Sequence, residues 1–241
     1  MLKYCLIKII TILNLIIEGW KMKIVLYMNL IIFICSLVGS IYGIQHFFKE
    51  KKALYLKLIT CSILCMMFAR LFQVISILTK GNLNDGFHIG MLGIIGTFMF
   101  LFSANYGQMD GLVDDKTEKF QKTRIISLIA PILVLLTYIF FITRVNNIEL
   151  LIAQGITTLF MMQCSYYCFK HIIIYDVDLG IIRSIRKYNV LVLIYTFLSM
   201  FEVIGLYANI KILYIISCIL IGIITLILLP VLKEGVEKWK I

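Results

Sequence analysis

The chain has 241 residues, of which 61% are hydrophobic, 15% are charged and two are proline. A soluble domain carries roughly 25% charged and 45–50% apolar residues, so a water-soluble fold has no place for this apolar surplus. The net charge of +10 does not indicate a nucleic-acid partner, because the basic residues punctuate the apolar runs instead of gathering on one polar segment. The composition predicts an integral membrane protein whose main partner is the lipid bilayer.

The N-terminal segment, residues 1–22, has an amphipathic pattern. At 100° per residue its polar side chains fall within an arc of roughly 140°. These side chains are Lys3, Lys8, Thr11, Asn14 and Glu18. The pattern favours a helix lying in the membrane interface. An eighth span with an inside N-terminus, or a native product that starts at Met22, stays open as an alternative.

Seven long apolar segments follow within residues 23–230. They are Ile24–Phe48, Ala53–Leu78, Gly86–Tyr106, Ile125–Thr143, Ile148–Ile174, Tyr188–Tyr207 and Ile212–Leu229. Each is long enough to cross a hydrocarbon core of ~30 Å as a helix. A barrel would need alternating polar and apolar residues, and no such pattern is present. The predicted fold is all-α, a seven-helix transmembrane bundle with a short tail at residues 231–241.

Lys and Arg residues concentrate at alternate connections, which predicts the orientation. The first, third and fifth connections and the tail hold Lys49, Lys51, Lys52, Lys57, Lys116, Lys119, Lys122, Arg124, Lys170, Arg183, Arg186, Lys187, Lys233, Lys238 and Lys240. The opposite connections hold Lys80, Arg144 and Lys211. We therefore expect a multi-pass protein of the cell membrane, with its N-terminus outside and its C-terminus in the cytosol.

Small residues and one proline predict how the spans pack. Gly39 and Gly43 form a G-x-x-x-G pattern in the first span, and the third span carries glycines at similar spacing. In lipid, helices associate through such close contacts. We expect the first and third spans to be close-packed interior helices, with homodimerisation through one of these faces as the alternative. Pro131 should kink the fourth span.

Two charged residues lie deep within predicted spans, and such residues are usually paired or functional. Arg70 of the second span and Glu202 of the sixth are expected at similar depth in the outer third of the membrane. Gln73 and Gln154 reach a comparable level. The hypothesis is an Arg70–Glu202 ion pair that lines an outward-facing polar cavity. The alternatives are an ion pair that only braces two helices, or an arginine that reaches the interface.

Two cysteine pairs at helical spacing form a weak candidate metal site. Cys61 and Cys65 lie on one face of the second span, and Cys164 and Cys168 lie on one face of the fifth. Thiolates suit Zn or Cu(I), but cysteine is also an ordinary apolar filler of helices. The filler interpretation is favoured, and neither a metal nor another cofactor is expected. All seven cysteines lie in apolar stretches, which does not indicate a disulfide framework.

The third connection carries four acidic residues, Asp110, Asp114, Asp115 and Glu118. Cytosolic carboxylates at this spacing can hold Mg²⁺ against a diphosphate. The arrangement loosely resembles membrane prenyltransferases, although their full paired aspartate motifs are absent. Ion pairs at a solvated helix end are the favoured interpretation.

No catalytic motif marks the chain as an enzyme. A nucleophile elbow, an H-E-x-x-H zinc motif, a P-loop and a dinucleotide fingerprint are all missing from the sequence. The favoured function is a receptor- or sensor-type protein, or an accessory membrane subunit, that acts through a protein partner on the cytosolic side. The alternative is a small transporter or a Mg-dependent lipid- or prenyl-modifying membrane enzyme.

Overall fold

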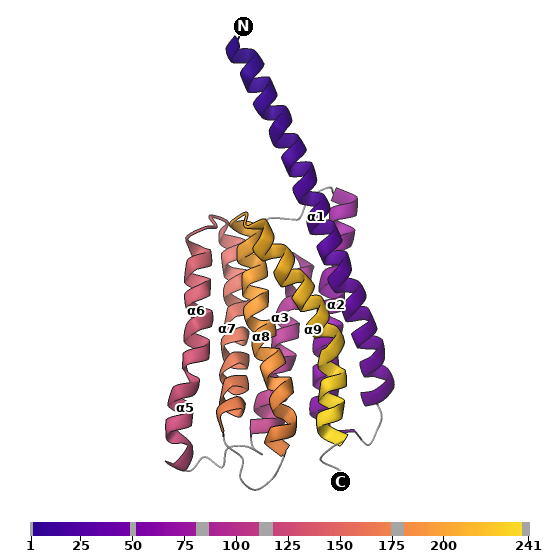
Figure 1. Cartoon of the computed structure of the whole chain (residues 1–241), viewed down its shortest axis with the longest axis vertical. Helices are drawn as coiled ribbons and strands as arrows, with labels where there is room; N and C mark the ends of the chain where they lie inside the picture. Colours follow the sequence, from indigo (N-terminus) through magenta and orange to yellow (C-terminus); the bar gives the residue numbers. More distant parts are fainter. Residues whose placement is uncertain (1, 49–51, 81–86, 111–117, 175–180, 238–241) are drawn as a thin grey trace.

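The structure, a computed structural model, describes residues 2–48, 52–80, 87–110, 118–174 and 181–237, and every regular element in these ranges is a helix (Figure 1). Within them, the side chains of residues 2–21, 108, 109, 119, 181–185 and 235–237 are not described. The elements are α1 (Leu2–Phe47), α2 (Leu54–Lys80), α3 (Ile89–Ala104), η1 (Asn105–Asp110), η2 (Glu118–Phe120), α5 (Gln121–Ser127), α6 (Ile129–Ile142), α7 (Ile148–Ile173), α8 (Ile181–Tyr207) and α9 (Lys211–Glu237).

Seven helical stretches in the described residues are long and apolar enough to cross a membrane, and their bounds follow the predicted spans closely. The α5 and α6 helices together make the fourth of these stretches, and α3 continues into η1. The prediction of an all-α seven-helix bundle is confirmed, and the chain is a multi-pass membrane protein.

The spans alternate in direction, which gives the bundle two distinct ends. The end drawn at the top of Figure 1, here called the upper end, contains the end of α2, the α6–α7 connection and the start of α9. By their positions in the chain, Lys80, Arg144 and Lys211 belong to these segments. The lower end contains the α1–α2 connection and the end of α9. The three cations of the sparsely charged connections therefore share one end. Which end faces the cytosol stays a prediction.

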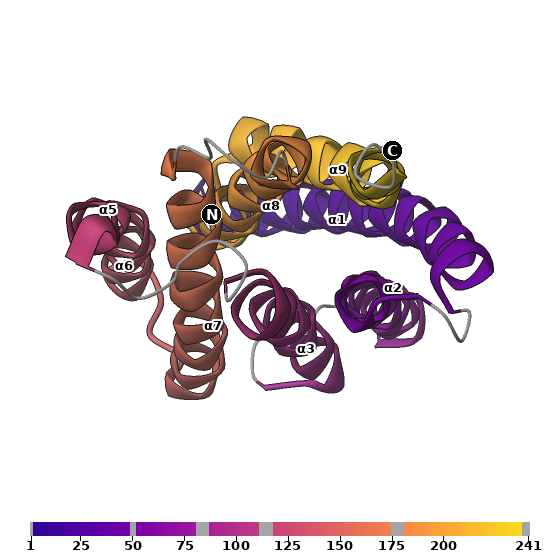
Figure 2. The ribbon, with the colours of Figure 1, turned by 90° about the horizontal axis from the view of Figure 1, so that it is seen from below.

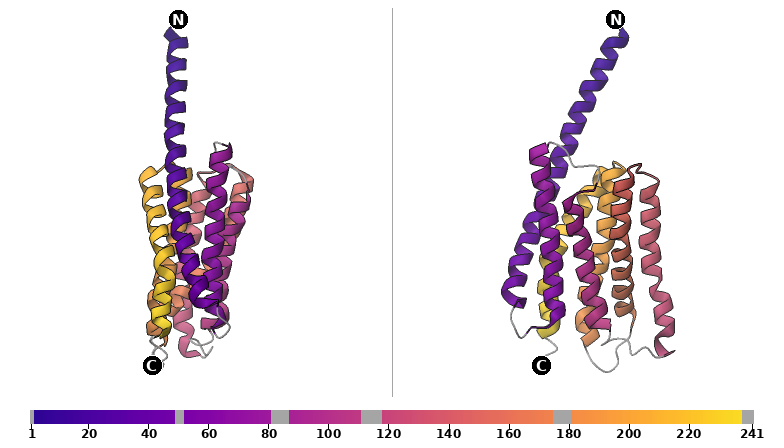
Figure 3. Two further views of the ribbon diagram at one scale, coloured as in Figure 1. Left: turned by 90° about the vertical axis from the view of Figure 1, so that its right-hand side faces the viewer. Right: turned by 180° about the vertical axis from the view of Figure 1, so that it is seen from behind.

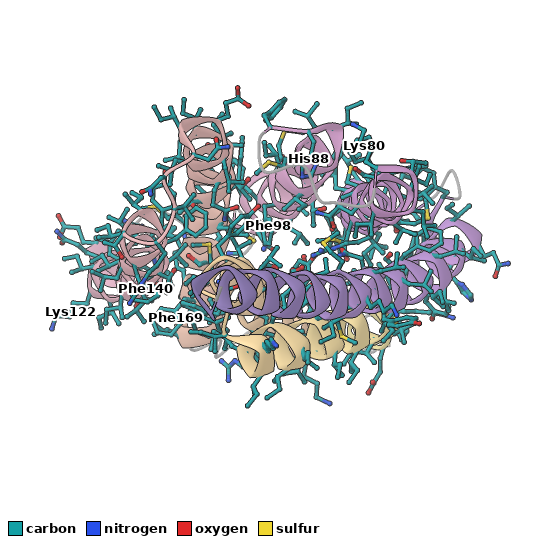
Figure 4. All side chains as sticks on the ribbon, turned by 90° about the horizontal axis from the view of Figure 1, so that it is seen from above. Lys80, His88, Phe98, Lys122, Phe140 and Phe169 are labelled. Carbon is teal, nitrogen blue, oxygen red and sulfur yellow. The ribbon has the colours of Figure 1, made fainter. Side chains whose placement is uncertain are left out.

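Six of the spans form a closed ring. In order around it, α1 contacts α2, α2 contacts α3, α3 contacts α7, α7 contacts α8, α8 contacts α9, and α9 returns to α1. The remaining span, α5–α6, lies outside this ring against α7, as the view from below shows (Figure 2). Seen from above, Phe98 lies toward the middle of the bundle, whereas Lys122 and Phe140 lie at its edge (Figure 4). The core is therefore enclosed by the ring.

Glycines mark the closest contacts between neighbours in the ring. A Cβ atom added at Gly39 would lie 2.6 Å from the backbone oxygen of Thr225 on α9, and one at Gly93 would lie 2.8 Å from the Cβ of Ala69 on α2. The close packing of the first and third spans is thus present, but their interior position is not. In the apolar 18-residue window of each span, only 33% of the residues of α1 and 39% of those of α3 are buried, against 56% for α2. In each of these two helices the glycines lie on the side that contacts a neighbouring helix, and the opposite side is exposed.

Proline has different effects in the fourth and seventh spans. The fourth span breaks at Leu128, three residues before Pro131, into α5 and α6. The interruption lies just before Pro131, whose ring clashes with the preceding turn. The kink of the fourth span itself stays a prediction. By contrast, α9 continues through Pro230 to Glu237. The buried side chains of Leu228, Leu229 and Leu232 hold both sides of Pro230 against the core, so the helix runs into the segment predicted as a tail.

The α1 helix begins at Leu2 and is continuous through the first predicted span. Its N-terminal part extends beyond the upper end of the bundle, as two further views show (Figure 3). The polar side chains that predict an interfacial helix at residues 1–22 lie outside the described side chains. That assignment stays a prediction.

Candidate functional site

A buried ion pair joins α2 to α8. Arg70 donates from Nη1 to Oε1 of Glu202 at 2.6 Å and from Nη2 to Oε2 at 2.5 Å. The two side chains are 3% and 8% exposed. Paired donors facing both carboxylate oxygens give a planar, charge-assisted contact of defined geometry. The structure thus brings together the two charged residues of the predicted intramembrane site.

Three further groups contact the guanidinium of Arg70. Its Nη1 also donates to Oδ1 of Asn29 and to Oε1 of Gln73, each at 3.0 Å, and its Nε points at the sulfur of Met66 at 3.3 Å. Asn29 is buried in α1 and donates its own amide back to the Val25 carbonyl oxygen. Three helices of the ring therefore converge on one guanidinium, whose charge is neutralised by Glu202.

A cavity of about 50 Å³ lies beside this ion pair. That volume holds a few water molecules. Its polar lining comes from α2, α7, α8 and the residue before α3: Arg70, Gln73, His88, Gln154, Ser199 and Glu202. His88 precedes α3 near the upper end (Figure 4). The cavity therefore reaches from the ion pair toward the upper end of the bundle.

Gln154 faces the cavity from α7 but does not contact the ion pair. Its amide points at the sulfur of Met200 at 3.5 Å, and its side chain is 4% exposed. The structure thus places Gln154 in the wall of the same cavity as Arg70 and Glu202. Gln73, in contrast, is held directly by Arg70.

His88 brings a titratable group to this cavity. Its ring stacks on Phe72 with centroids 5.7 Å apart, and its Nδ1 has no hydrogen-bond partner among the described residues. Burial lowers the pKa of His88 below 6.5, because the charged ring loses its hydration. The neutral ring is the form that the fold favours.

The sequence pattern does not reveal two contributors to this site. Asn29 is a single amide in the most hydrophobic stretch of α1, and His88 lies in a connection between spans. For Asn29 the available signal is an uncharged polar residue at membrane depth, since such groups normally hydrogen-bond to another helix. His88 carries no comparable signal.

The acidic connection is only partly described. Asp114 and Asp115 lie outside the described residues, and Glu118 is exposed in η2. Asp110, at the end of η1, forms an ion pair with Lys170 and lies 3.2 Å from Nε2 of His171. Burial raises the pKa of Asp110, but the hydrogen bonds and charges of His171 and Lys170 outweigh burial and leave it below 3.8. Asp110 is thus paired with Lys170 of α7. The local ion pairs expected within the third connection stay a prediction.

The two cysteine pairs are not brought together. Cys65 faces Gly96 of α3, whereas Cys168 accepts a hydrogen bond from the Asn105 amide at 3.1 Å. Since α3 stands between α2 and α7 in the ring, the pairs lie on opposite sides of it. No group of three or more His, Cys, Asp or Glu side chains suited to a metal occurs in the described part of the chain. The weak metal candidate at Cys61, Cys65, Cys164 and Cys168 gains no support.

No protein-family model, curated protein or solved structure matches this chain. The class of protein is therefore defined by the fold and composition alone, as a multi-pass membrane protein with seven apolar helices.

Proposed function

We propose that this chain is a receptor- or sensor-type membrane protein, which binds a small polar ligand in the cavity beside Arg70 and Glu202. The observation that carries the proposal is the lining of that cavity, where an ion pair, two amides and a histidine meet in the interior of the bundle. Small-molecule sites are usually apolar pockets with a small number of polar groups that point toward the same space.

The charge of the wall favours one class of ligand. Arg70 and Glu202 neutralise each other, so an ion of either sign would leave a buried charge uncompensated. A small zwitterion with the charges of an amino acid avoids this cost, because its carboxylate can approach Arg70 while its ammonium group approaches Glu202. The ion pair would then open as the ligand binds, which would link occupancy to the distance between α2 and α8.

The proposed orientation places the cavity toward the outside and the lower end in the cytosol. The bias of Lys and Arg toward the lower connections supports this orientation. A change in the α2–α8 distance would then reach a protein partner through the lower connections.

The experiment is a thermal-unfolding screen of the purified protein in detergent against each of the twenty L-amino acids and glycine betaine. A ligand that binds only the folded protein raises the unfolding temperature. The test variant is Gln154→Leu, which removes one amide from the cavity wall at similar volume. The matched control is Gln163→Leu on the exposed face of the same helix.

We expect at least one zwitterion to raise the unfolding temperature of the wild type and of Gln163→Leu, with a much smaller effect on Gln154→Leu. The proposal fails if none of these compounds shifts the wild type. It also fails if the shift is the same in Gln154→Leu, because binding would then occur outside the cavity.

A further inference from the structure

The face of α8 that lines the cavity changes from polar to apolar toward the upper end of the bundle. Ser199 and Glu202 are its polar members, and Val203 and Leu206 follow them in the chain. The α8 helix ends at Tyr207, at the upper end (Figure 1). Because an α-helix rises about 1.5 Å per residue, Leu206 lies about 6 Å above Glu202 along the axis. The apolar part of this face therefore lies between the ion pair and the upper end.

Two other helices add buried apolar side chains to the cavity wall near the upper end. Met91 lies in the first turn of α3 and Leu150 in the first turn of α7, and both line the cavity. They belong to one hydrophobic cluster, against which Val203 of α8 packs. It is called the upper cluster, and its buried members are Met91, Phe141, Val145, Leu150, Ala153 and Ile204. Three helices thus give the cavity an apolar wall above the ion pair.

Below the ion pair, the main core of the bundle closes the cavity. Met66 and Met161 line it there, and both belong to the larger hydrophobic cluster. Met66 lies one turn below Arg70 on α2, and its sulfur is 3.3 Å from Nε of Arg70. Two groups in contact leave no space for a ligand atom between them. A ligand whose charged groups lie at Arg70 and Glu202 therefore has its remaining atoms beside the upper cluster.

His88, the polar residue of the cavity nearest the upper end, is directed elsewhere. A Cβ atom added at Gly90 would lie 2.9 Å from Nδ1 of His88 and 3.2 Å from the backbone oxygen of Ala69, so this nitrogen lies where α2 and α3 meet. The ring itself stacks on Phe72. A hydroxyl or amide group that entered the upper cluster would lose its hydration, a cost that a methyl group does not have.

We propose that the ligand is an amino acid with a compact apolar side chain, such as that of valine, which packs against Met91, Leu150 and Val203. The inference rests on the proposed function, because it needs the charged groups of the ligand at the ion pair. The upper cluster then selects the side chain by apolar burial. An aromatic side chain is too large, because a benzene-sized group occupies a cavity of roughly 150 Å³, whereas this cavity measures about 50 Å³.

The experiment is isothermal titration calorimetry of the purified full chain in detergent with L-valine, L-threonine and L-phenylalanine. Threonine matches valine in shape but carries a hydroxyl group in place of one methyl group, and phenylalanine tests size. The variant Leu150→Ala removes most of one side chain from the apolar wall. The matched control is Leu159→Ala on the same helix, because Leu159 is 60% exposed. Unfolding temperatures establish that each variant is folded.

We expect the wild type and Leu159→Ala to bind valine about tenfold more tightly than threonine, the equivalent of one hydroxyl group buried without a good partner. Phenylalanine should bind them about tenfold more weakly than valine, because it overfills the cavity. Leu150→Ala should bind phenylalanine more tightly than the wild type does and valine more weakly. An unfolded variant cannot produce this gain of binding.

The inference is overturned if threonine or phenylalanine binds the wild type as tightly as valine does. These two comparisons need no variant, and in either case the proposed function stands because a zwitterion still binds. It is also overturned if folded Leu150→Ala binds phenylalanine no better than the wild type does. If none of the amino acids binds, the proposed function fails and this inference fails with it.

Discussion

Arg70 on α2 and Glu202 on α8 are 132 positions apart in the chain, yet they share two hydrogen bonds of 2.6 and 2.5 Å. Their helices are not neighbours in the ring, since α3 and α7 separate them on one side and α1 and α9 on the other. The contact therefore crosses the interior of the bundle. A buried ion pair adds little net stability, but the loss of one partner is costly.

Glu202→Gln should destabilise the protein by about 3–5 kcal/mol, because the charge of Arg70 then stays buried without its counter-ion. The double variant Arg70→Met/Glu202→Gln, which buries no charge, should recover much of this loss. Unfolding in detergent measures both as a double-mutant cycle. Lys80→Gln, at the exposed upper end of α2, serves as the control and should change stability little. If the single and double variants are destabilised equally, the contribution of Glu202 to stability does not depend on the charge of Arg70.

The spans were predictable because hydropathy and length leave few alternatives in lipid. The interruption at Leu128 lies just before Pro131, whose ring clashes with the preceding turn. The pairing of Arg70 with Glu202 followed from their similar expected depth. Depth, however, does not say which helices meet. Asn29 joins the site only because α1 packs between α2 and α9, and no local pattern encodes that order.

The order of the helices also bears on the two cysteine pairs. Cys61 with Cys65 and Cys164 with Cys168 each share a helical face, as their spacing predicts. The interposed α3 keeps the two pairs apart. The interior position expected for α1 and α3 is also wrong, because glycine spacing identifies a contact face and not the number of neighbours.

Acid should destabilise the wild type through His88. Burial lowers the pKa of His88, so the unfolded chain takes up a proton near pH 6.5 while the folded chain still resists it. Stability from the neutral ring is thus fully present above pH 6.5 and is lost as the pH falls below that value. Unfolding temperatures of the wild type and of His88→Gln, measured across this range, should converge toward lower pH. Parallel pH profiles for the two proteins would exclude His88 as the source of the loss of stability in acid.

Asp110→Asn should cost up to about 3 kcal/mol, because the ammonium group of Lys170, which is only 3% exposed, would lose its ion pair with Asp110. The pKa of Asp110 is below 3.8, so its contribution is present above pH 3.8 and is lost as the pH falls through the lower folded value. The stability difference between wild type and variant should shrink over that acidic range. Glu118→Gln in η2, where the side chain is exposed, should leave stability near the wild-type value. A similar loss in both variants would argue against a specific Asp110–Lys170 pair.

Gly39→Ala should destabilise the bundle by about 1–3 kcal/mol through overpacking. The added methyl group would lie 2.6 Å from the Thr225 carbonyl oxygen, and backbone atoms cannot rotate away. The control is Gly107→Ala, where nothing lies within 4 Å of the added atom. Unfolding in detergent compares the two. If Gly39→Ala is as stable as wild type, α1 and α9 do not pack as closely as the structure shows.

The membrane topology offers the most direct test of the whole arrangement. A reporter that works only in the cytosol should be active when fused after Ile241 and inactive when inserted between Val145 and Asn146, in the α6–α7 connection at the upper end. A reporter that works only after export should show the reverse pattern. Activity of one reporter at both positions would contradict an odd number of crossings between them and with it the seven-span bundle. Exchanged activities would keep the spans but place the cavity on the cytosolic side.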